Sequence, residues 1–422
     1  MTPQGVEEQV ALLMQGTEYG DATLQAAMAA ELKQRLLLAE AEGRRLRVYA
    51  GFDPRTSDLH LGHTIPMRKM RQFQELGHDV IFVVGSFTSL IGDPSDKDRL
   101  RPRLSEEQVR ANAATYAEQA FKILDRRATR IEFNHTWLGK LTLQQAIPLA
   151  ANLTLQQFLT RETFRKRWDK DDPIYLHETF YALVQAYDAY HLRADVQIGG
   201  TDQLFNIVTA GRKLMEALGV LPNIGVIMGI LPGTDGVLKM SKSLGNNIPL
   251  NTTPEDMYGK VMSVPDGAMP AFFRLLTRWE PAEVAARLAE IGAGAIHPMH
   301  AKMDLAREIV AIYHGQAAVA PAEEHFKRVY QEGGVPEALL EFELPPSSSA
   351  TDALVALEWV RSRTEARRKV DEGAVWLDGS QITSSDAPLA LDPDLFAVLR
   401  LGKKNQAKLR AQSTEDQPDS EE

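Results

Sequence analysis

The feature that most constrains the fold is a repeated alternation of short apolar runs and helical patterns. The runs LRVYAGF (46–52) and DVIFVVGSF (79–87) have the length and the β-branched and aromatic content of buried strands. A helical pattern at 67–76 lies between them. Two buried strands joined through a helix predict a parallel pair with a right-handed crossover.

Three further runs extend this pattern into a larger sheet. Strand-like segments occur at 130–133, 194–200 and 224–231, with helical patterns between them. They predict an α/β fold with an open, Rossmann-like parallel sheet, whose ligands should bind at the carboxyl ends of the strands. The helix-like segment 141–166 interrupts the alternation, which indicates a helical insertion between the two halves of the sheet.

Beyond the sheet the strand signals fade and the chain changes character. Thr253-Pro254-Glu255 has the composition of a helix start, and helical patterns continue to about residue 330. ELPPSSSA (343–350) has the composition of a linker. We therefore expect a catalytic domain at 1–245 with a glycine-flanked loop at 233–246, an all-α domain at 246–342, a linker at 343–350, a small α+β domain at 351–410 and a disordered acidic tail at 411–422.

Composition and charge remove several classes of function. The 422 residues contain no Cys, which excludes disulfides, thiolate metal sites and a Cys nucleophile. The formal net charge of −10 means that any nucleic acid must meet a local basic surface. The N-terminus lacks a basic start with a continuous apolar run, and no long apolar stretch occurs. We expect a cytoplasmic protein with no membrane partner.

Two motifs follow the first and last expected strands. HLGH (60–63) places His60 and His63 on one face of an opening helix turn, where imidazoles and free backbone N–H groups would face an anion. KMSKS (239–243) places Lys239 and Lys242 on a loop next to glycines, which suits a polyphosphate. Surface histidines and solvated lysines are the plain alternatives for each motif alone. Their occurrence in this order favours a shared phosphate site.

A third motif points to the substrate. Tyr181, Gln185 and Asp188 in YALVQAYD lie along one helical face, which could also be an ordinary polar helix surface. The motif is preceded by IGDPS (91–95) and followed by QIGGTDQ (197–203). HLGH and KMSKS together resemble the signatures of class I aminoacyl-tRNA synthetases, and the third motif in this setting resembles the tyrosyl-tRNA synthetase family. The resemblance extends from about residue 46 to 410 and includes MSVPD (262–266) and HAKMDLAREIV (300–310).

The resemblance implies a set of substrate contacts. The tyrosine contacts would be Tyr49 and Asp188 at the phenolic hydroxyl, and Asp93, Tyr181, Gln185 and the nearby Thr88 at the α-amino group. The ATP contacts would be Asp202 and the backbones of Gly51 and Gly200 at the ribose, Gln203 at the reacting carboxyl and α-phosphate, and Asp53 and Met240 beside the adenylate. The pyrophosphate would be surrounded by His60, His63, Lys97, Arg101, Lys239 and Lys242.

The chemistry that the resemblance implies needs no general base. The tyrosine carboxylate is ionised at neutral pH and attacks the α-phosphorus of ATP, and a terminal ribose hydroxyl of tRNA(Tyr) then attacks the adenylate. The protein must supply positive charge and N–H donors to the phosphates. No local Asp/Glu cluster forms a metal cage, so we expect Mg²⁺ to arrive with ATP and predict no protein-bound metal. Family resemblance also implies a homodimer, with 141–166 at the interface.

Three positions depart from the family pattern. Arg55 stands where many relatives have a small hydroxyl residue, and it would either face the γ-phosphate or pair with a neighbouring acid. Leu204-Phe205 follows Gln203 where Trp-Gly is common, so the backbone there is expected to differ. SDKDRLRPR (95–103) aligns in more than one way, so the pyrophosphate contact assigned to Arg101 could belong to Arg99.

The C-terminal segment carries a cluster of basic residues. Arg363, Arg367, Arg368 and Lys369 crowd one short helix before the strand-like AVWLDG. The segment is similar to the small RNA-binding domain of a ribosomal small-subunit protein, and a solvated charged helix is the alternative. Residues 351–410 carry ten basic and nine acidic side chains, so the clustering rather than net charge supports phosphate contact.

Two other functions compete with the synthetase hypothesis. A non-catalytic synthetase-like protein would bind RNA or regulate, but such a protein would be expected to lose the charged loop or the adenylate contacts, which this chain keeps. A nucleotidyltransferase of the same α/β superfamily would make a dinucleotide cofactor. It would lack the face formed by Tyr181, Gln185 and Asp188, and it would need no appended RNA module.

Overall fold

The computed structural model describes residues 5–54, 59–95, 105–331, 341–393, 395–402 and 405–412. By their internal contacts the residues form two compact units, Met1–Val319 and Ala320–Glu422, which are described separately below.

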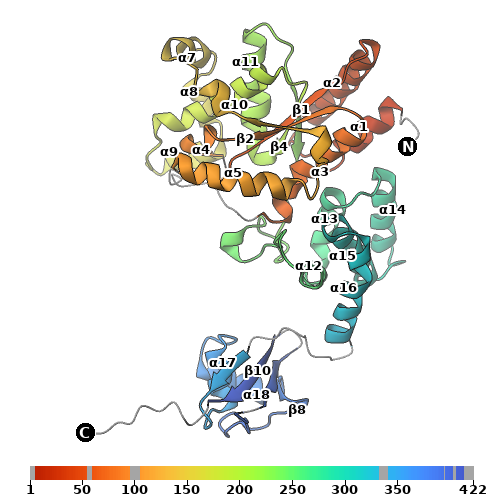
Figure 1. Cartoon of the computed structure of the whole chain (residues 1–422), viewed down its shortest axis with the longest axis vertical. Helices are drawn as coiled ribbons and strands as arrows, with labels where there is room; N and C mark the ends of the chain where they lie inside the picture. Colours follow the sequence, from red (N-terminus) through yellow and green to blue (C-terminus); the bar gives the residue numbers. More distant parts are fainter. Residues whose placement is uncertain are drawn as a thin grey trace. The chain divides into compact units, whose positions relative to one another are not determined.

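A five-stranded parallel sheet forms the centre of the first unit (Figure 1). All five expected strands are present, each shorter than or close to its expected range, so the α/β prediction is confirmed. Their order in the sheet is β3-β2-β1-β4-β5. The strands are β1 Arg47–Phe52, β2 Asp79–Val84, β3 Thr129–Phe133, β4 Val196–Gly200 and β5 Ile224–Met228.

This strand order reverses between β1 and β4. The chain runs outward from β1 to β2 and β3, and then returns to place β4 on the other side of β1. Tyr49 of β1 pairs with Gln197 of β4 at this point. Where the strand order reverses, the helices that follow the two neighbouring strands diverge and leave a crevice at the carboxyl ends of those strands. Proteins with α/β folds bind their ligands in this crevice.

Helices connect the strands and pack against the sheet (Figure 1). The side chains of Tyr49 and Ile81 point to one face of the sheet, where α10 Leu176–Leu192 packs through Val184 and Ala189. The other helices up to β5 are α1 Val6–Met14, α2 Ala22–Ala41, α3 Leu61–Glu75, α4 Thr88–Ile91, α5 Glu106–Ala120, α6 His135–Leu138 and α11 Arg212–Ala217. Short 3₁₀ turns are η1 Arg126–Ala128 and η2 Thr201–Gln203, and η3 Phe205–Gly211 is π-helical.

The expected insertion is a group of three short helices. They are α7 Leu143–Ala150, α8 Leu155–Leu159 and α9 Glu162–Asp169. Thr142 and Thr154 begin α7 and α8 with reciprocal capping boxes, which satisfy backbone N–H groups that a short helix would otherwise leave open. The helices pack on α10 and α11 through Phe158, Phe164 and Leu214.

The helices after β5 belong to the same compact unit as the sheet. They are α12 Pro254–Met262, α13 Met269–Leu276, α14 Pro281–Gly292 and α15 Pro298–His314, with the 3₁₀ turns η4 Lys242–Leu244, η5 Asp266–Ala268 and η6 Gln316–Ala318. Thr253 caps α12 as the sequence predicts, by accepting a hydrogen bond from the Asp256 amide. The hydroxyls of Thr64 in α3 and Tyr313 in α15 lie 2.7 Å apart. The boundary expected at residue 246 therefore lies inside one unit.

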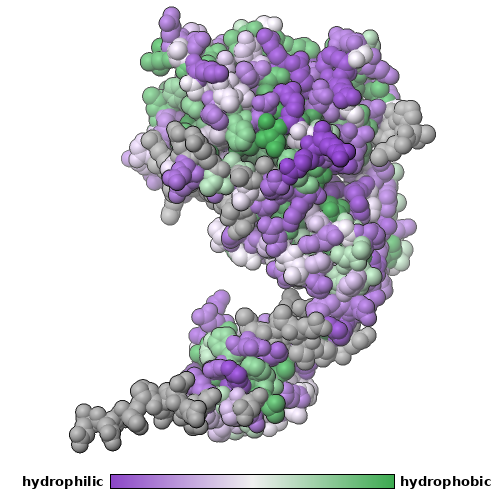
Figure 2. All heavy atoms as spheres, in the orientation of Figure 1, coloured by the Kyte–Doolittle hydropathy of each residue, from purple (hydrophilic) through white to green (hydrophobic). Residues whose placement is uncertain are grey.

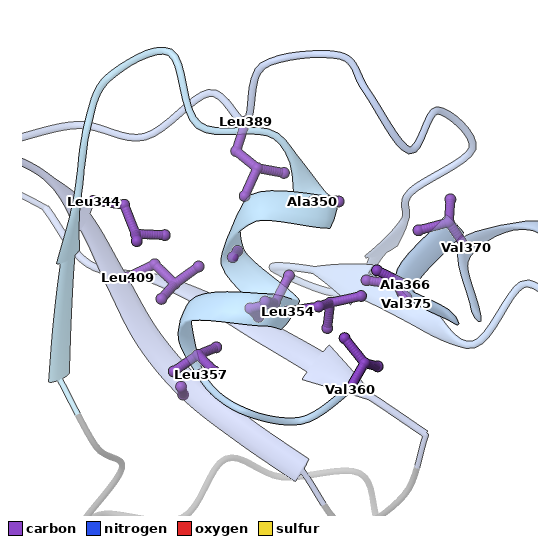
Figure 3. Close-up of a cluster of buried hydrophobic side chains, with 13 residues drawn as sticks. Leu344, Ala350, Leu354, Leu357, Val360, Ala366, Val370, Val375, Leu389 and Leu409 are labelled. Carbon is purple, nitrogen blue, oxygen red and sulfur yellow. The ribbon is translucent and has the colours of Figure 1, made fainter. Parts of the chain in front are cut away.

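The second unit contains α16 Val319–Phe326, the π-helical turn η7 Lys327–Gln331 and a small α+β domain. Its sheet has the order β6-β10-β9-β7-β8, with β6 parallel to β10 and the other pairs antiparallel. Leu354, Val375 and Leu409 are among the side chains that form its core (Figure 3). The elements are β6 Glu341–Leu344, α17 Ala350–Ala356, α18 Arg363–Asp371, β7 Val375–Leu377, β8 Ser380–Gln381, β9 Ala397–Leu401 and β10 Asn405–Ala411.

The linker expected at 343–350 is wrong. Glu343 and Leu344 form part of β6, and Leu344 is buried in the core of the small domain. The serines at the end of the segment resemble a linker in composition, but Ser349 caps α17 through reciprocal hydrogen bonds with Asp352. The boundary expected at residue 411 is also wrong, because Ala411 closes β10. Residues 413–422 lie outside the described residues.

Surface polarity agrees with a folded globular chain. On the face drawn in Figure 2, hydrophilic side chains cover most of the surface and hydrophobic ones form small groups. Across the described ranges, no helix combines the length and the apolar character needed to cross a membrane.

Candidate active site

The expected site residues gather at the carboxyl ends of β1 and β4. Tyr49 and Gly51 come from β1, and Gly200 closes β4 directly before Asp202 and Gln203. A Cβ added to Gly200 would lie 2.6 Å from the Asp202 Oδ1 atom, so only glycine permits this close approach. A Cβ added to Gly51 would meet no atom of the described residues within 4 Å.

Asp188 of α10 is buried and held by two neutral donors. The Trp137 indole Nε1 donates to its Oδ1 at 2.7 Å, and the Asn134 amide donates to its Oδ2 at 3.2 Å. The Asp188 pKa is raised to about 7, mainly by burial with a smaller contribution from the nearby Asp53, while the two hydrogen bonds act to lower it. Among the described residues, hydrogen bonds orient this carboxylate and no ion pair compensates its charge.

Tyr49 lies beside this carboxylate in the same buried cluster. Its side chain is 1% exposed, and its hydroxyl lies 3.5 Å from the Gln185 carbonyl oxygen, at the limit of a hydrogen bond. Burial and the neighbouring Asp188 raise the Tyr49 pKa well above its ordinary value, so the phenol keeps its proton. Tyr49 and Asp188 thus offer a hydroxyl and an acceptor in the buried interior.

Asp53 is held by Thr88 and Tyr181. The Thr88 hydroxyl donates to Asp53 Oδ1 at 2.7 Å, and the Tyr181 hydroxyl donates to Oδ2 at 3.1 Å. A Cβ added to Gly85 would lie 2.0 Å from Asp53 Oδ1 and 2.4 Å from the Thr88 hydroxyl. The glycine after β2 is therefore required for this contact, a constraint that the sequence pattern does not reveal.

Asp93, Gln203 and Asn206 form a second group of hydrogen-bonded polar side chains. Asp93 accepts the Ser95 amide at 2.9 Å and the Gln203 side-chain amide at 2.6 Å. The Gln203 carbonyl in turn accepts from the Asn206 amide at 2.9 Å. These bonds hold Asp93 and Gln203 in one orientation, beside the carboxyl end of β4.

Gln185 has a buried acceptor that no described residue satisfies. Its Oε1 atom is inaccessible to solvent and receives no hydrogen bond within the described part of the chain. Buried polar atoms are almost always paired in folded proteins, so an unsatisfied acceptor lining a crevice is suited to a ligand donor.

His60 and His63 lie at the start of α3 with their ring centroids 3.8 Å apart. The Gly62 amide donates to His60 Nδ1 and the His60 amide donates to His63 Nδ1, both at 3.2 Å. Burial lowers the pKa of His60 to about 3, with smaller contributions from His63 and Lys239, and burial and Lys239 lower that of His63 to about 4. Both rings are neutral at neutral pH, and because Nδ1 accepts, each ring carries its proton on Nε2 as a donor.

The loop that carries Lys239 and Lys242 is braced at its base by Asn246. The Asn246 side chain accepts from the Ser241 amide at 2.8 Å and donates to Asp235 Oδ2 at 2.5 Å. Buried Met240 lies against the first turn of α3, because a Cβ on Gly62 would come within 3.7 Å of the Met240 Cβ. Lys239 Nζ is 3.5 Å from Asp202 Oδ2. The loop and the two histidines therefore border the same end of the crevice.

Three expected phosphate contacts, Arg55, Lys97 and Arg101, and the alternative Arg99 lie outside the described residues. The four basic residues expected to bind RNA lie on α18, in the second unit. Each is ion-paired with an acid: Arg363 with Asp352, Arg367 with Asp386 at 3.2 Å, and Arg368 and Lys369 with Glu372 at 3.5 and 2.8 Å. Any phosphate must therefore compete with carboxylates for this cluster.

Comparison with known proteins agrees with the site. A family model described as "tRNA synthetases class I (W and Y)" matches residues 41–331. The tyrosine–tRNA ligase of Desulfotalea psychrophila is 42% identical over 411 residues, which are 97% of this chain and 99% of that protein. The corresponding ligase of Moorella thermoacetica is 44% identical over 380 residues, 90% of this chain and 91% of that protein. The chain belongs to the tyrosyl-tRNA synthetase family.

Solved structures give the same fold for this synthetase family member. A truncated mitochondrial tyrosyl-tRNA synthetase of Aspergillus nidulans has a TM-score of 0.60 at 21% identity, covering 77% of this chain and 94% of that one. The enzyme of Archaeoglobus fulgidus, solved with L-tyrosine, has a TM-score of 0.57 at 20% identity, covering 76% and 99%. The family prediction and the class I synthetase assignment are confirmed, and with them the use of tyrosine, ATP and tRNA as substrates.

The synthetase site also contains residues that the sequence analysis missed. Asn134 and Trp137, which hold Asp188, come from the turn after β3 and from α6, where no motif draws attention. Arg161, a buried cation of the insertion, also lies near this site. Among the described residues no group of three or more His, Asp or Glu side chains could hold a metal ion.

Proposed function

We propose that the crevice between β1 and β4 performs both steps of tyrosine–tRNA ligation, with the residue roles given below. The tyrosine carboxylate attacks the α-phosphorus of ATP and pyrophosphate leaves, giving tyrosyl-adenylate. The terminal ribose hydroxyl of tRNA then attacks the carbonyl carbon, and AMP leaves. The observation that carries the proposal is the buried Asp188 carboxylate, held by Trp137 and Asn134 at the end of the crevice.

The phenolic hydroxyl of tyrosine is recognised by Asp188 and Tyr49. A substrate without this hydroxyl would leave both buried groups without their partner, and an unpaired buried polar group is costly. Tyrosyl-tRNA synthetase is itself the standard illustration of how such a site rejects phenylalanine without editing, so we use that logic and claim no magnitude. Trp137 and Asn134 keep the carboxylate oriented when the site is closed by substrate.

The α-amino group is recognised by three acceptors. Asp93 supplies the charge, Tyr181 a hydroxyl, and Gln185 its otherwise unsatisfied Oε1 atom. An ammonium has three N–H donors, so three acceptors satisfy it completely. Thr88 supports this end by holding Asp53, which lies beside the adenylate.

The nucleotide binds from the β4 end toward α3. Asp202 and the backbones of Gly51 and Gly200 hold the ribose, and Gln203 contacts the reacting carboxyl and α-phosphate. His60 and His63 donate Nε2–H hydrogen bonds to the departing pyrophosphate as neutral rings. Lys239 and Lys242 bring positive charge, and Met240 anchors their loop against α3. These donors act as charge develops, which is the purpose of a transition-state site. Lys97, Arg101 and Arg55 are proposed to complete the phosphate contacts, and Mg²⁺ to enter with ATP.

Transfer to tRNA and assembly into a dimer involve surfaces away from the crevice. We infer that α18 contacts RNA through Arg363, Arg367, Arg368 and Lys369, and that α12–α15 lie on the anticodon side. The insertion and the start of α10 expose large apolar side chains unusual for a solvated surface, and we infer that a second copy covers them. They are Leu143, Ile147, Leu155, Trp168, Tyr175 and Leu176, exposed by 73, 61, 64, 62, 48 and 71%.

The primary test is pyrophosphate exchange with each of the twenty amino acids. We expect exchange with tyrosine only, abolished or strongly reduced by Asp188→Ala. Exchange with no amino acid would favour the non-catalytic RNA-binding alternative, and unchanged kcat/KM in Asp188→Ala would refute the assignment of that residue. Sedimentation of the wild type and of Trp168→Glu tests the dimer. A dimer that forms equally in both proteins would contradict the proposed interface.

The role of α18 is tested by charge reversal in the full chain. Arg367→Glu with Arg368→Glu should reduce aminoacylation, with the largest loss at low salt and a shallower salt dependence than wild type, while pyrophosphate exchange stays near wild type. Aminoacylation at the wild-type rate across salt concentrations would exclude α18 as an RNA contact. A matched reversal at Arg45, an exposed arginine paired with Asp79 in the first unit and outside the proposed dimer interface, controls for added negative charge.

A further inference from the structure

Arg161 occupies an unusual position between the insertion and the proposed tyrosine site. It lies directly before α9, and its side chain is 8% exposed. The guanidinium carbon lies 5.0 Å from the ring centroid of Phe164 and 5.2 Å from that of Phe205. Phe205 begins the π-helical turn after Gln203, where this sequence departs from the common Trp-Gly. The two rings form an aromatic slot that fixes the plane of the guanidinium.

The guanidinium joins a closed ring of hydrogen bonds. Arg161 Nη2 donates to the Ser95 hydroxyl oxygen at 2.6 Å, and the Asn206 amide donates to the same oxygen at 3.2 Å. Asn206 also donates to Gln203, Gln203 donates to Asp93, and the Ser95 amide donates to Asp93. The ring therefore connects the proposed α-amino contact with the proposed carboxyl contact, and Arg161 is its attachment to the insertion.

Arg161 does not form a stabilising ion pair with any of the described residues. Its Nη1 atom is buried and has no hydrogen-bond partner among the described residues, and it forms no ion pair there. Burial lowers its pKa, whereas Asp93, Tyr181, Asp202 and Glu178 favour the charged form. Arg167 of α9 shows the contrast, because its guanidinium donates to both oxygens of Glu178 at 2.6 and 2.9 Å. An incompletely satisfied buried cation costs stability, which points to a role in the site.

We propose that Arg161 is a positioning residue for tyrosine activation, acting through Ser95 to fix Asp93 and Gln203 relative to each other. The inference rests on the proposed roles of those two residues. Because Asp93 accepts the ammonium and Gln203 contacts the carboxyl, a disordered ring misplaces both groups on the tyrosine α-carbon. Loss of Arg161 therefore weakens tyrosine binding and slows adenylate formation together, while the KM for ATP changes less.

The test is a double-mutant cycle with Arg161→Gln, Ser95→Ala and the combined variant. The dissociation constant for tyrosine without ATP and the single-turnover rate of adenylate formation are measured for each, with thermal unfolding alongside. A hydrogen bond to a charged group contributes enough that each single variant should raise the dissociation constant roughly tenfold. The combined variant should bind tyrosine no more weakly than the weaker-binding of the two single variants, because both changes remove the same contact. Arg161→Lys should restore only part of the binding, because it lacks the planar fork.

The matched control is Arg167→Gln, a buried arginine of the same insertion outside the ring. It should lower the unfolding temperature without raising the tyrosine dissociation constant. Three results would each overturn the inference. The first is additive effects in the cycle, and the second is a tyrosine dissociation constant within twofold of wild type for Arg161→Gln or Ser95→Ala. The third is an equal increase of the tyrosine dissociation constant in Arg167→Gln. Tyrosine-dependent pyrophosphate exchange by the wild type separates failure of this inference from failure of the proposed function. A wild type without this exchange would overturn the proposed function itself.

Discussion

Replacement of Trp137 by Phe should change the pH dependence of tyrosine binding. The indole Nε1 donates to Asp188 at 2.7 Å, and it is one of the two hydrogen bonds that counter burial of this carboxylate. A phenyl ring keeps the stack on His191, where the ring centroids are 4.5 Å apart, but it cannot donate. The variant therefore removes one donor and preserves most of the packing.

The magnitude follows from the strength of a hydrogen bond to a charged group. Such a bond contributes about 1.5 to 3 kcal/mol, and at 1.36 kcal/mol per pKa unit its loss raises the Asp188 pKa by about one to two units. The wild-type pKa of about 7 would move to about 8 or 9. At pH 7.5 the ionised fraction then falls roughly three- to twenty-five-fold, and tyrosine affinity falls with it.

The direction of the pH effect depends on which protonation state of Asp188 binds tyrosine. An ionised carboxylate accepts the substrate hydroxyl more strongly than a protonated one, so affinity decreases as the pH falls below the pKa of the free site. Wild-type affinity should therefore be flat above about pH 7 and decrease below it. In Trp137→Phe the decrease should begin one to two pH units higher.

The assay is equilibrium dialysis of tyrosine between pH 5.5 and 8.5, with thermal unfolding to verify folding. Asp188→Asn serves as a control that should bind weakly and without this pH dependence. Phenylalanine is a second control, because its ring has no hydroxyl to donate. Superimposable pH profiles for wild type and Trp137→Phe, or an unchanged profile in Asp188→Asn, would refute the reasoning.

Three further outcomes are expected. Lys239→Ala and Lys242→Ala should lower the stopped-flow rate of adenylate formation more than they raise the tyrosine dissociation constant, because pyrophosphate contacts strengthen in the transition state; normal rates with weaker binding would contradict this. Gly85→Ala should reduce both activity and unfolding temperature, because the added Cβ would lie 2.0 Å from Asp53 Oδ1. An unfolding temperature equal to that of the wild type would contradict this and show that the turn relaxes. His63 has a pKa lowered to about 4, so the unfolded chain binds more protons between about pH 4 and 6.5 and stability decreases as pH falls through this window. His63→Gln should reduce this acid sensitivity of the urea midpoint, and an unchanged slope would contradict it.

The sheet could be predicted from the sequence because most of its strands, such as β2 and β5, are buried on both faces. A continuous apolar run such as 80–84 has few other structures available in a domain of this size. The segment 343–350 could not be assigned in this way. Pro and Ser occur both in linkers and in turns that end in a helix cap, and only pairing of β6 with β10 distinguishes them.

The candidate site shows a similar division. The motif residues that the structure describes lie on the expected elements, with Asp188 on α10 and Gln203 in the turn after β4, and their roles stay predictions. Asn134 and Trp137 were missed because they come from a turn and a short helix without periodicity, and their function depends on a contact that spans 51 residues for Trp137. Gly85 is hidden for the same reason: its requirement comes from Asp53, a neighbour only in the folded chain.

The distribution of charge in the crevice links its stability to its specificity. Asp53 and Asp188 receive hydrogen bonds from Thr, Tyr, Trp and Asn side chains, with no ion-pair partner for Asp188 among the described residues. A lysine or arginine beside Asp188 would stabilise the free protein, but it would also occupy the acceptor that the substrate hydroxyl requires. Neutral donors orient the carboxylate and leave its charge for the ligand, at the cost of a pKa raised to about 7. The lysines instead lie on the loop proposed to contact the phosphates, where Lys239 Nζ is 3.5 Å from Asp202 Oδ2. In the proposed assignment, tyrosine selection and phosphate stabilisation therefore use separate sets of groups, and either set can be altered by mutation while the function of the other is measured.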